Sequence, residues 1–225
     1  MNKKTFLTGL STLLITIFSF SQGLTSIDVS TEKLYMSSDV SKPIDALGSP
    51  YINENFLPVK IKGYDNVLYT GRYNAYNGEM EINLGTKIIA LDKTQPYEVT
   101  FTQNNKNYKT FNFISKTGVA KSGFLNVIDS ATTHSLLKEE TIRFVDKVPA
   151  ATSYQRDKPA KFIANESNYY LKVGDKITPV PTRKKDLLKS YAKDAKKIKS
   201  YLKDNKVSLK KEEDIKKLAL YLASL

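Results

Sequence analysis

The sequence predicts an α+β protein: a mostly antiparallel β meander of roughly ten strands, followed by two C-terminal amphipathic helices. Between residues 56 and 180, short segments of alternating apolar and polar residues are separated by turn-forming residues. No segment with helical periodicity interrupts them, which favours an antiparallel over a parallel sheet. After Pro181 the apolar spacing becomes helical. A meander of this kind can curl into a half-barrel.

The first half of the sheet has the clearest alternation. Leu57, Val59 and Ile61 alternate with residues typical of a wet face, as in a half-buried strand. Asn77-Gly78 is a strong hairpin signal between a strand at residues 68–76 and its return strand at 79–84. Further strands are expected at residues 87–91, 97–101 and 109–114.

The second half is patterned more loosely. Strands are expected at residues 123–128, 135–138, 140–145, 161–164, 169–173 and 176–180. Residues 148–159 contain two prolines and mixed polarity, so a loop is expected there. The polar segment before Gly48 is expected to be a lead-in with one short strand near residues 33–36.

The C-terminal segment has two helical stripes. The first helix is expected from Arg183 to about Asp204, capped by Thr182. Its apolar stripe comprises Leu187, Tyr191, Ala195, Ile198 and Leu202. The second helix is expected to be capped by Ser208 and to bury Ile215, Leu218, Ala219 and Leu222. Each stripe must be covered by the sheet or by the other helix.

The N-terminus has the order of a secretory signal peptide. Lys3 and Lys4 precede an apolar stretch at residues 5–18, which is too short to span a bilayer. Small residues then place cleavage between Ser21 and Gln22. The alternative is a retained membrane anchor. We expect four parts: signal peptide 1–21, polar lead-in 22–47, β domain 48–181 and helical segment 182–225.

Composition narrows the chemistry. The chain has no cysteine, which rules out a lipid-modified cysteine, disulfides, thiolate metal sites and cysteine nucleophiles. We therefore expect a periplasmic or secreted protein that is not a lipoprotein and has no transmembrane helix in its mature part. The net charge of +12 is concentrated in the tail, because residues 183–225 contain 14 basic and 6 acidic residues. Export argues against nucleic acid as the partner.

The helical tail supplies the one candidate docking site. Solvated helix faces explain most lysine-rich segments, but this one could also dock on an acidic protein or an anionic membrane. The candidate docking residues are Lys193, Lys196, Lys197 and Lys199.

No catalytic, cofactor-binding or metal-binding residue is predicted. The single histidine, His134, is expected in an exposed turn, and it cannot build a histidine-rich zinc site. Glu79 and Glu81 share a strand face, which is expected to be solvated rather than to form a glycosidase pair. Several tyrosines could line a ligand surface, although cross-strand packing is the simpler expectation: Tyr64, Tyr69, Tyr73, Tyr76 and Tyr97.

Four segments carry a resemblance to a known family. GSPYINENF (48–56), RYNAYNGEMEI (72–82), HSLLKEE (134–140) and the lysine-rich ending at 184–222 resemble exported proteins of Bacteroidota-type Gram-negative bacteria with no assigned activity. The resemblance covers about residues 45–225. It implies export across the inner membrane and provides no catalytic residues.

These observations favour a non-enzymatic binding module of the cell envelope. Its partner would be an envelope protein or an anionic membrane surface. The alternative is a periplasmic carrier of a lipid or other hydrophobic ligand, held by a half-barrel sheet with the helices as a lid. A more remote alternative is a hydrolase of envelope polymers.

Overall fold

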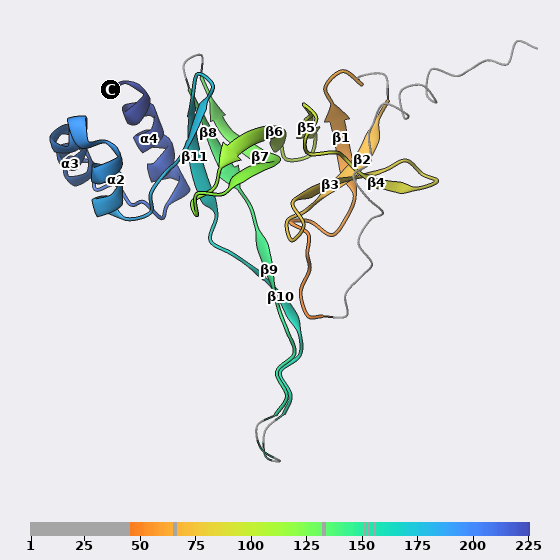
Figure 1. The fold of residues 1–225 in the computed structure, drawn as a ribbon. Coiled ribbons are helices and arrows are strands. Elements are labelled where there is room, and N and C mark those ends of the chain that lie inside the picture. The colour runs from red at the N-terminus through yellow and green to blue at the C-terminus, as the bar shows by residue number, and fades with distance from the viewer. Residues whose placement is uncertain (1–45, 65–66, 132–133, 151, 153, 155) are drawn as a thin grey trace, which may run out of the picture.

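The computed structural model describes residues 46–64, 67–131, 134–150, 152, 154 and 156–225. The expected signal peptide, its cleavage site and the strand near residues 33–36 lie outside these residues. The described part is an α+β structure with twelve strands and three α-helices (Figure 1). The expected fold class is therefore confirmed. None of its helices is long and apolar enough to cross a membrane.

The strands agree closely with the alternating segments. Their bounds are β1 Leu57–Ile61, β2 Tyr69–Asn74, β3 Glu79–Asn83, β4 Ile88–Ala90, β5 Glu98–Phe101, β6 Asn107–Ile114, β7 Ala120–Ser130, β8 His134–Glu139, β9 Ile142–Val145, β10 Lys161–Ala164, β11 Asn168–Val173 and β12 Lys176–Pro179. Ten of them form one antiparallel sheet, while β9 and β10 form a separate pair. The hairpin expected at Asn77-Gly78 joins β2 to β3, and Gly78 has the positive φ of 68° that this turn requires.

The strand order departs from a simple meander in two places. The order is β12-β11-β8-β7-β6-β5-β1-β2-β3-β4. β5 pairs with β1 rather than with β4, and Val59 lies opposite Phe101. β11 returns to pair with β8 after the chain has left the sheet through β9 and β10. These pairings join segments far apart in sequence, which local alternation cannot reveal.

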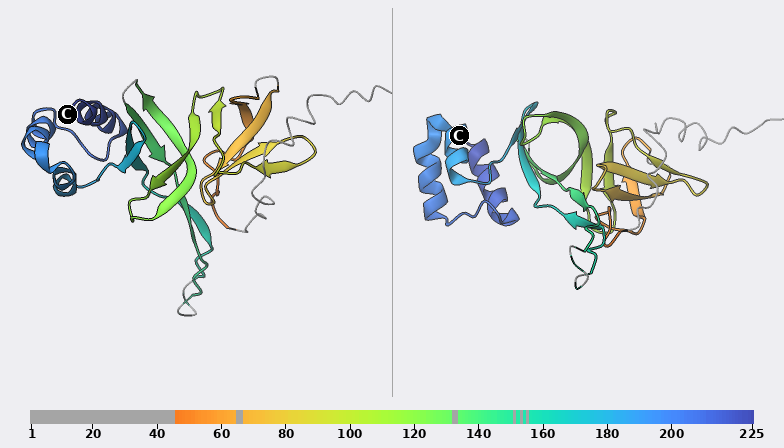
Figure 2. Two further views of the ribbon diagram at one scale, coloured as in Figure 1. Left: turned by 45° about the horizontal axis from the view of Figure 1, so that its top comes forward. Right: turned by 60° about the horizontal axis from the view of Figure 1, so that its bottom comes forward.

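The sheet curls along β7, the longest strand (Figure 2). A register shift between Val127 and Asp129 marks a bulge in its pairing with β8. Bulges bend a strand and increase its twist. β12 at the far edge of the sheet contacts β6, so that β6, β7, β8, β11 and β12 enclose a small interior. That interior holds Phe113, Leu125, Leu137 and Tyr170.

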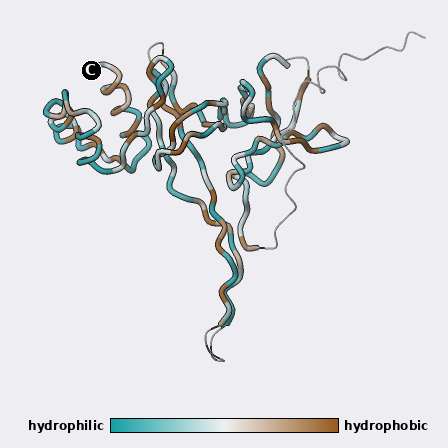
Figure 3. The backbone as a smooth tube through the Cα atoms, in the orientation of Figure 1, coloured by the Kyte–Doolittle hydropathy of each residue, from teal (hydrophilic) through white to brown (hydrophobic). Residues whose placement is uncertain are grey.

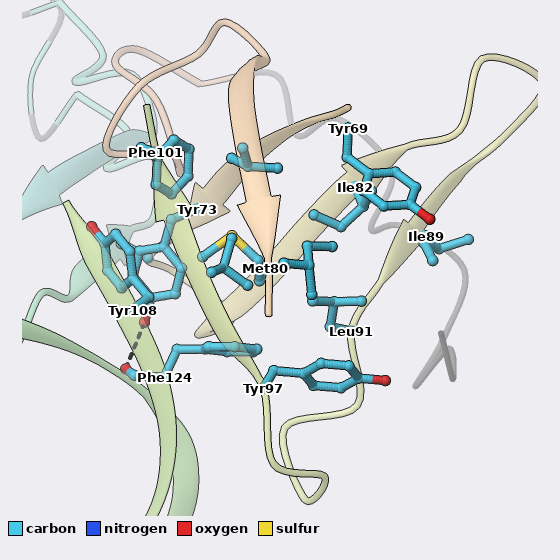
Figure 4. Close-up of a cluster of buried hydrophobic side chains, with 14 of the residues drawn as sticks. Tyr69, Tyr73, Met80, Ile82, Ile89, Leu91, Tyr97, Phe101, Tyr108 and Phe124 are labelled. Atoms are coloured by element: carbon cyan, nitrogen blue, oxygen red, sulfur yellow. Dashed lines mark hydrogen bonds between the residues drawn. The ribbon is translucent and has the colours of Figure 1, made fainter. Parts of the chain in front are cut away.

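A larger core lies under the other half of the sheet, between β1–β5 and β7 (Figure 4). It is rich in aromatic residues, and the Tyr73 hydroxyl lies 3.5 Å from the carbonyl oxygen of Phe124. The ring of Tyr73 lies 4.8 Å from that of Tyr108. The fully buried side chains of Val59, Met80 and Ile82 belong to the same core.

A third core joins the helices to the outer face of the sheet. The helices are α2 Lys184–Ser190, α3 Ala195–Asp204 and α4 Glu212–Ala223, with a 3-10 turn, η1, at Ala192–Asp194. Leu136 of β8 and Leu171 of β11 face this core, whereas the adjacent Leu137 faces the interior of the curl. β8 is therefore buried on both faces, and the helices cover the outside of the curl rather than its opening (Figure 1).

The helix ends differ from the expected ones. The segment expected to form one helix forms two, because α2 ends at Ser190 and α3 begins at Ala195. Ser190 donates a hydrogen bond to the carbonyl oxygen of Asp186, a contact that bends helices. Thr182 and Ser208 are not the caps: the cap positions are Arg183 and Lys211, and neither has a side-chain cap bond.

The region expected to be a loop forms part of an arm. β9 and β10 pair over four residues each, and a bridge between Val148 and Lys158 continues the pairing. The arm projects from the body of the protein (Figure 1). At its base, the rings of Phe144 and Phe162 contact that of Tyr76 from the β2–β3 turn, with centroids 5.3–6.3 Å apart.

Candidate functional site

The four lysines expected to dock lie together on η1 and α3. Lys193, Lys196, Lys197 and Lys199 are all exposed, and we call them the lysine surface. Their position follows from the apolar stripe, because Ile198 and Leu202 point into the core beneath α3. The opposite face of the helix must therefore carry the lysines outward. Figure 3 shows α2 and α3 as mostly hydrophilic.

The charge of the lysine surface is largely uncompensated. Within the described residues, Asp194 is the one acidic residue in salt-bridge contact with it, 2.8 Å from Lys197. This hydrogen bond and charge raise the pKa of Lys197. The ammonium group of Lys197 is therefore charged at neutral pH. Among the described residues from 183 to 211, no large apolar side chain is exposed.

The helices are fixed to the sheet by an ion pair as well as by their core. Glu212, in the first turn of α4, accepts bonds from Lys138 of β8 at 2.8 Å and from the hydroxyl of Tyr169 of β11 at 2.9 Å. Burial alone would raise the pKa of Glu212, but these donors outweigh burial and lower it. This ion pair anchors α4 to the sheet, and Ile198 and Leu202 pack α3, which carries most of the lysine surface, into the same core as α4.

The paired glutamates of β3 do not lie on a solvated face, so that expectation was wrong. Glu81 is fully buried, and Arg72 Nε donates to its carboxylate at 2.8 Å. The Tyr51 hydroxyl, at 3.2 Å, and Asn74 Nδ2, at 3.3 Å, also donate to it. Glu79 is only half-buried and interacts with Asn77 instead. Arg72 lies opposite Glu81 in the β2–β3 register, so the hairpin signal could have revealed this pair.

His134 is also placed differently from the expectation. It begins β8 and is 6% exposed, so it is a buried strand residue and not an exposed turn residue. Its backbone pairs with Val173 of β11. Among the described residues, no group of three histidine, cysteine, aspartate or glutamate side chains could hold a metal ion.

Two adjacent glutamates that the sequence did not single out are buried at the end of β8. Glu139 accepts hydrogen bonds from the Tyr170 hydroxyl and from Asn168 Nδ2, both at 2.8 Å, and from Lys121 at 3.3 Å. Burial would raise the pKa of Glu139, but these three donors together lower it. Glu140 pairs with Lys106 at 3.0 Å and accepts a short hydrogen bond from the Tyr108 hydroxyl.

The five candidate tyrosines have different surroundings. Tyr69, Tyr73 and Tyr97 are buried in the core of Figure 4, and Tyr64 packs against the same core. Burial, followed by the charges of Glu140 and Glu139, raises the pKa of Tyr73 well above its ordinary value. Tyr76 differs, because 41% of it is exposed.

Tyr76 borders a cleft of about 340 Å³ between the two halves of the sheet. One wall is the β2–β3 turn, and the other is formed by Phe113 of β6 and by residues 121–124 of β7. Glu139 and the residues that follow it close the base, and Lys93 contributes from the loop after β4. We call this space the central cleft. Its lining residues come from distant segments, so no local pattern in the sequence could reveal it.

The turn that forms one wall is held in place. Asn74 Oδ1 accepts hydrogen bonds from the backbone N–H groups of Tyr76 at 3.2 Å and Asn77 at 3.1 Å. The aromatic contacts at the base of the arm orient the Tyr76 ring. The cleft is therefore preformed. Comparison of the chain with family models, curated protein sequences and solved structures finds no match, so its expected relationship to the Bacteroidota-type exported proteins stays a prediction.

Proposed function

We propose that this protein is a non-enzymatic binding module of the cell envelope that docks through its lysine surface on an anionic membrane. The observation that carries the proposal is the exposure of four neighbouring lysines on η1 and α3, where α3 packs into the core that joins the helices to the sheet. The proposal also rests on the signal peptide expected at residues 1–21.

The composition of the surface favours a membrane over a protein partner. Specific protein interfaces depend on a few apolar or aromatic anchors in a desolvated centre. Around the lysine surface, the described residues from 183 to 211 expose no large apolar side chain. A diffuse anionic surface needs no such anchors, because each lysine near it contributes about 1 kcal/mol.

The number of lysines gives the expected free energy of membrane binding. Lys193, Lys196 and Lys199 contribute their full charge to membrane binding, whereas the charge of Lys197 is partly neutralised by Asp194. The total is about 3–4 kcal/mol, or roughly two to three orders of magnitude in membrane partitioning at low salt. Screening should remove most of it at about 1 M salt, where the Debye length falls to about 3 Å.

The experiment is co-sedimentation with vesicles. The protein, purified from the periplasm of a producing cell, is mixed with phosphatidylglycerol/phosphatidylethanolamine vesicles or with phosphatidylcholine vesicles. We expect binding only to the anionic vesicles and loss of binding in high salt. Replacing the four lysines of the lysine surface by glutamate should abolish binding.

A matched control keeps the same change of net charge elsewhere on the protein. Lys60, Lys87, Lys158 and Lys176 are exposed on the β region and have no salt-bridge partner among the described residues. Their replacement by glutamate should leave much of the binding intact. Equal loss in both variants would show a net-charge effect and refute a docking face. Cross-linking to an envelope protein, without vesicle binding, would favour the protein partner instead.

A second candidate, the carrier of a hydrophobic ligand, is supported by one observation. A cavity of about 450 Å³ lies at the opening of the curl, beside Phe113, Ile177 and Ile114, which is 49% exposed. However, the helices do not cover this opening, and the interior behind it is filled by side chains of the sheet. Native mass spectrometry tests the idea: an extractable lipid mass supports it, and a bare protein mass contradicts it.

A further inference from the structure

We propose that the central cleft binds a sugar that carries one negatively charged group. The inference goes beyond the membrane-docking proposal and shares no residue with the lysine surface. It rests on the size of the cleft, on the mixture of aromatic and polar groups that line it, and on their net charge.

The size of the cleft suits a small ligand. Its volume of about 340 Å³ is near the lower limit of small-molecule sites, which is about 300 Å³. The space is open next to Gly123: a Cβ added there would have one heavy-atom neighbour within 4 Å, Phe113 Cε1 at 4.0 Å. The backbone of β7 therefore lets a ligand approach closely at this residue.

The lining combines the two features that a sugar ring requires. Tyr76, which is 41% exposed, offers aromatic surface for the apolar C–H face of a ring, and the nearly buried rings of Phe113 and Phe124 border the cleft beside it. The hydroxyls of Ser122 and Thr141, which also bond Asn112 at 2.6 Å and Asn165 at 3.1 Å, and the side chain of Asn77 offer hydrogen-bonding groups for its hydroxyls. A lipid chain would exclude water from these polar groups and from the ammonium group of Lys93, which is costly.

The charges of the lining select an anion. Lys93 and Lys121 each contribute one positive charge, and Glu139 contributes one negative charge, so the net charge is +1. Lys121 and Glu139 already compensate each other at 3.3 Å. In the described structure, no carboxylate lies within salt-bridge distance of Lys93. The ammonium group of Lys93 is thus the group that would bind a carboxylate or phosphate on the sugar.

The test is an NMR titration of the protein purified from the periplasm, with amide shifts as the readout. The probes are N-acetylmuramate, D-glucuronate, glucose 6-phosphate and uncharged glucose. We expect at least one anionic sugar to shift the amides of Tyr76, Asn77 and Gly123 saturably. Glucose should bind at least about tenfold more weakly, as expected when one charged contact is lost. A preference for the carboxylate or the phosphate probe would identify the anionic group.

Three variants connect the binding to the cleft. Gly123→Val should fill the open space and abolish binding, while Lys93→Ala should weaken it about tenfold. Lys87→Ala, an exposed lysine outside the cleft, is the matched control and should change nothing. If Gly123→Val does not fold, Tyr76→Ala in the exposed turn tests the proposal in its place, and it should weaken binding. The proposal is overturned if no anionic sugar binds saturably below about 20 mM, if glucose binds equally well, or if these variants bind like the wild type.

Discussion

The buried pair of Arg72 and Glu81 allows the sharpest test of what holds the first half of the sheet together. The Glu81 side chain is 0% exposed, that of Arg72 is 18% exposed, and their atoms lie 2.8 Å apart. Removing one partner of such a pair leaves an uncompensated buried charge, at a cost of about 3–5 kcal/mol. Arg72→Met removes the charge but keeps much of the side-chain volume.

The cost of losing the ion pair alone lies in the lower half of that range, at about 3–4 kcal/mol. Glu81 keeps two donors, the Tyr51 hydroxyl and Asn74 Nδ2, which partly compensate its charge. The variant also loses the stacking of the guanidinium on the rings of Tyr51 and Phe56, at 3.7 and 4.4 Å from their centroids. Each contact adds about 0.5–1 kcal/mol at a partly exposed site. We expect a total of about 4–6 kcal/mol.

A double-mutant cycle separates the pair from general damage. Replacing a buried ion pair by apolar residues of similar volume is often nearly neutral, so Arg72→Met/Glu81→Leu should recover about 2 kcal/mol or more relative to the sum of the single variants. The assay is urea unfolding followed by far-UV circular dichroism and tyrosine fluorescence, because the chain has no tryptophan.

The matched control is the exposed pair of Lys216 and Glu213, also 2.8 Å apart, whose glutamate side chain is 75% exposed. Lys216→Met should cost less than about 0.5 kcal/mol. The reasoning is refuted if the two Arg72 and Glu81 substitutions are additive, or if Arg72→Met costs no more than Lys216→Met.

Three further predictions concern other parts of the fold. The pKa of Glu139 is lowered in the folded protein, so its interactions stabilise the fold above the unfolded-state pKa of about 4.3 and are lost as the pH falls through the lower folded-state pKa. Asn168→Ala removes one of the donors to Glu139, so it should reduce this acid-dependent stability in urea titrations at pH 2–7. An unchanged pH profile would contradict the prediction. Gly71→Ala would place a Cβ 3.0 Å from Ile82 Cδ1 and 3.1 Å from the Glu81 carbonyl oxygen, so it should lower the free energy of unfolding by about 1–3 kcal/mol, whereas Gly123→Ala, with open space, should be nearly neutral. Ile198→Ala, in the fully buried stripe of α3, should cost about 2–4 kcal/mol in the same assay, and a smaller loss than Lys199→Ala would show that the helices are not packed as described.

The sequence was informative where the signal is local. The expected strand at residues 161–164 has the bounds of β10, and the segment at 169–173 differs from β11 by one residue. Alternation is a local property of one strand, and it survives because each strand must bury one face. Alternation gives the wrong prediction for Glu81, because a charged residue at an alternating position can be buried when a partner such as Arg72 compensates its charge.

Long-range features were beyond this kind of reasoning. The pairing of β1 with β5 and of β8 with β11 joins segments that no turn connects. The lining of the central cleft likewise comes from five separate stretches of the chain. The exposed lysines of the lysine surface were predictable from the helical stripe alone. Lys93 and Gly123, in contrast, become candidate binding residues only because the fold brings them to the central cleft.

The double burial of β8 has a consequence for the order of folding. Leu136 and Leu137 are neighbours that face different cores, so a slip of one residue would exchange the two sides. One of the strands that fixes the register of β8 is β11, which is synthesised about thirty residues after β8. The helices are synthesised after β11. A chain that emerges N-terminus first thus carries β8 with one edge unpaired until Asn168–Val173 arrives. In this interval the strand is exposed to mispairing with other chains, and a chaperone that holds unpaired strands would have the most to protect.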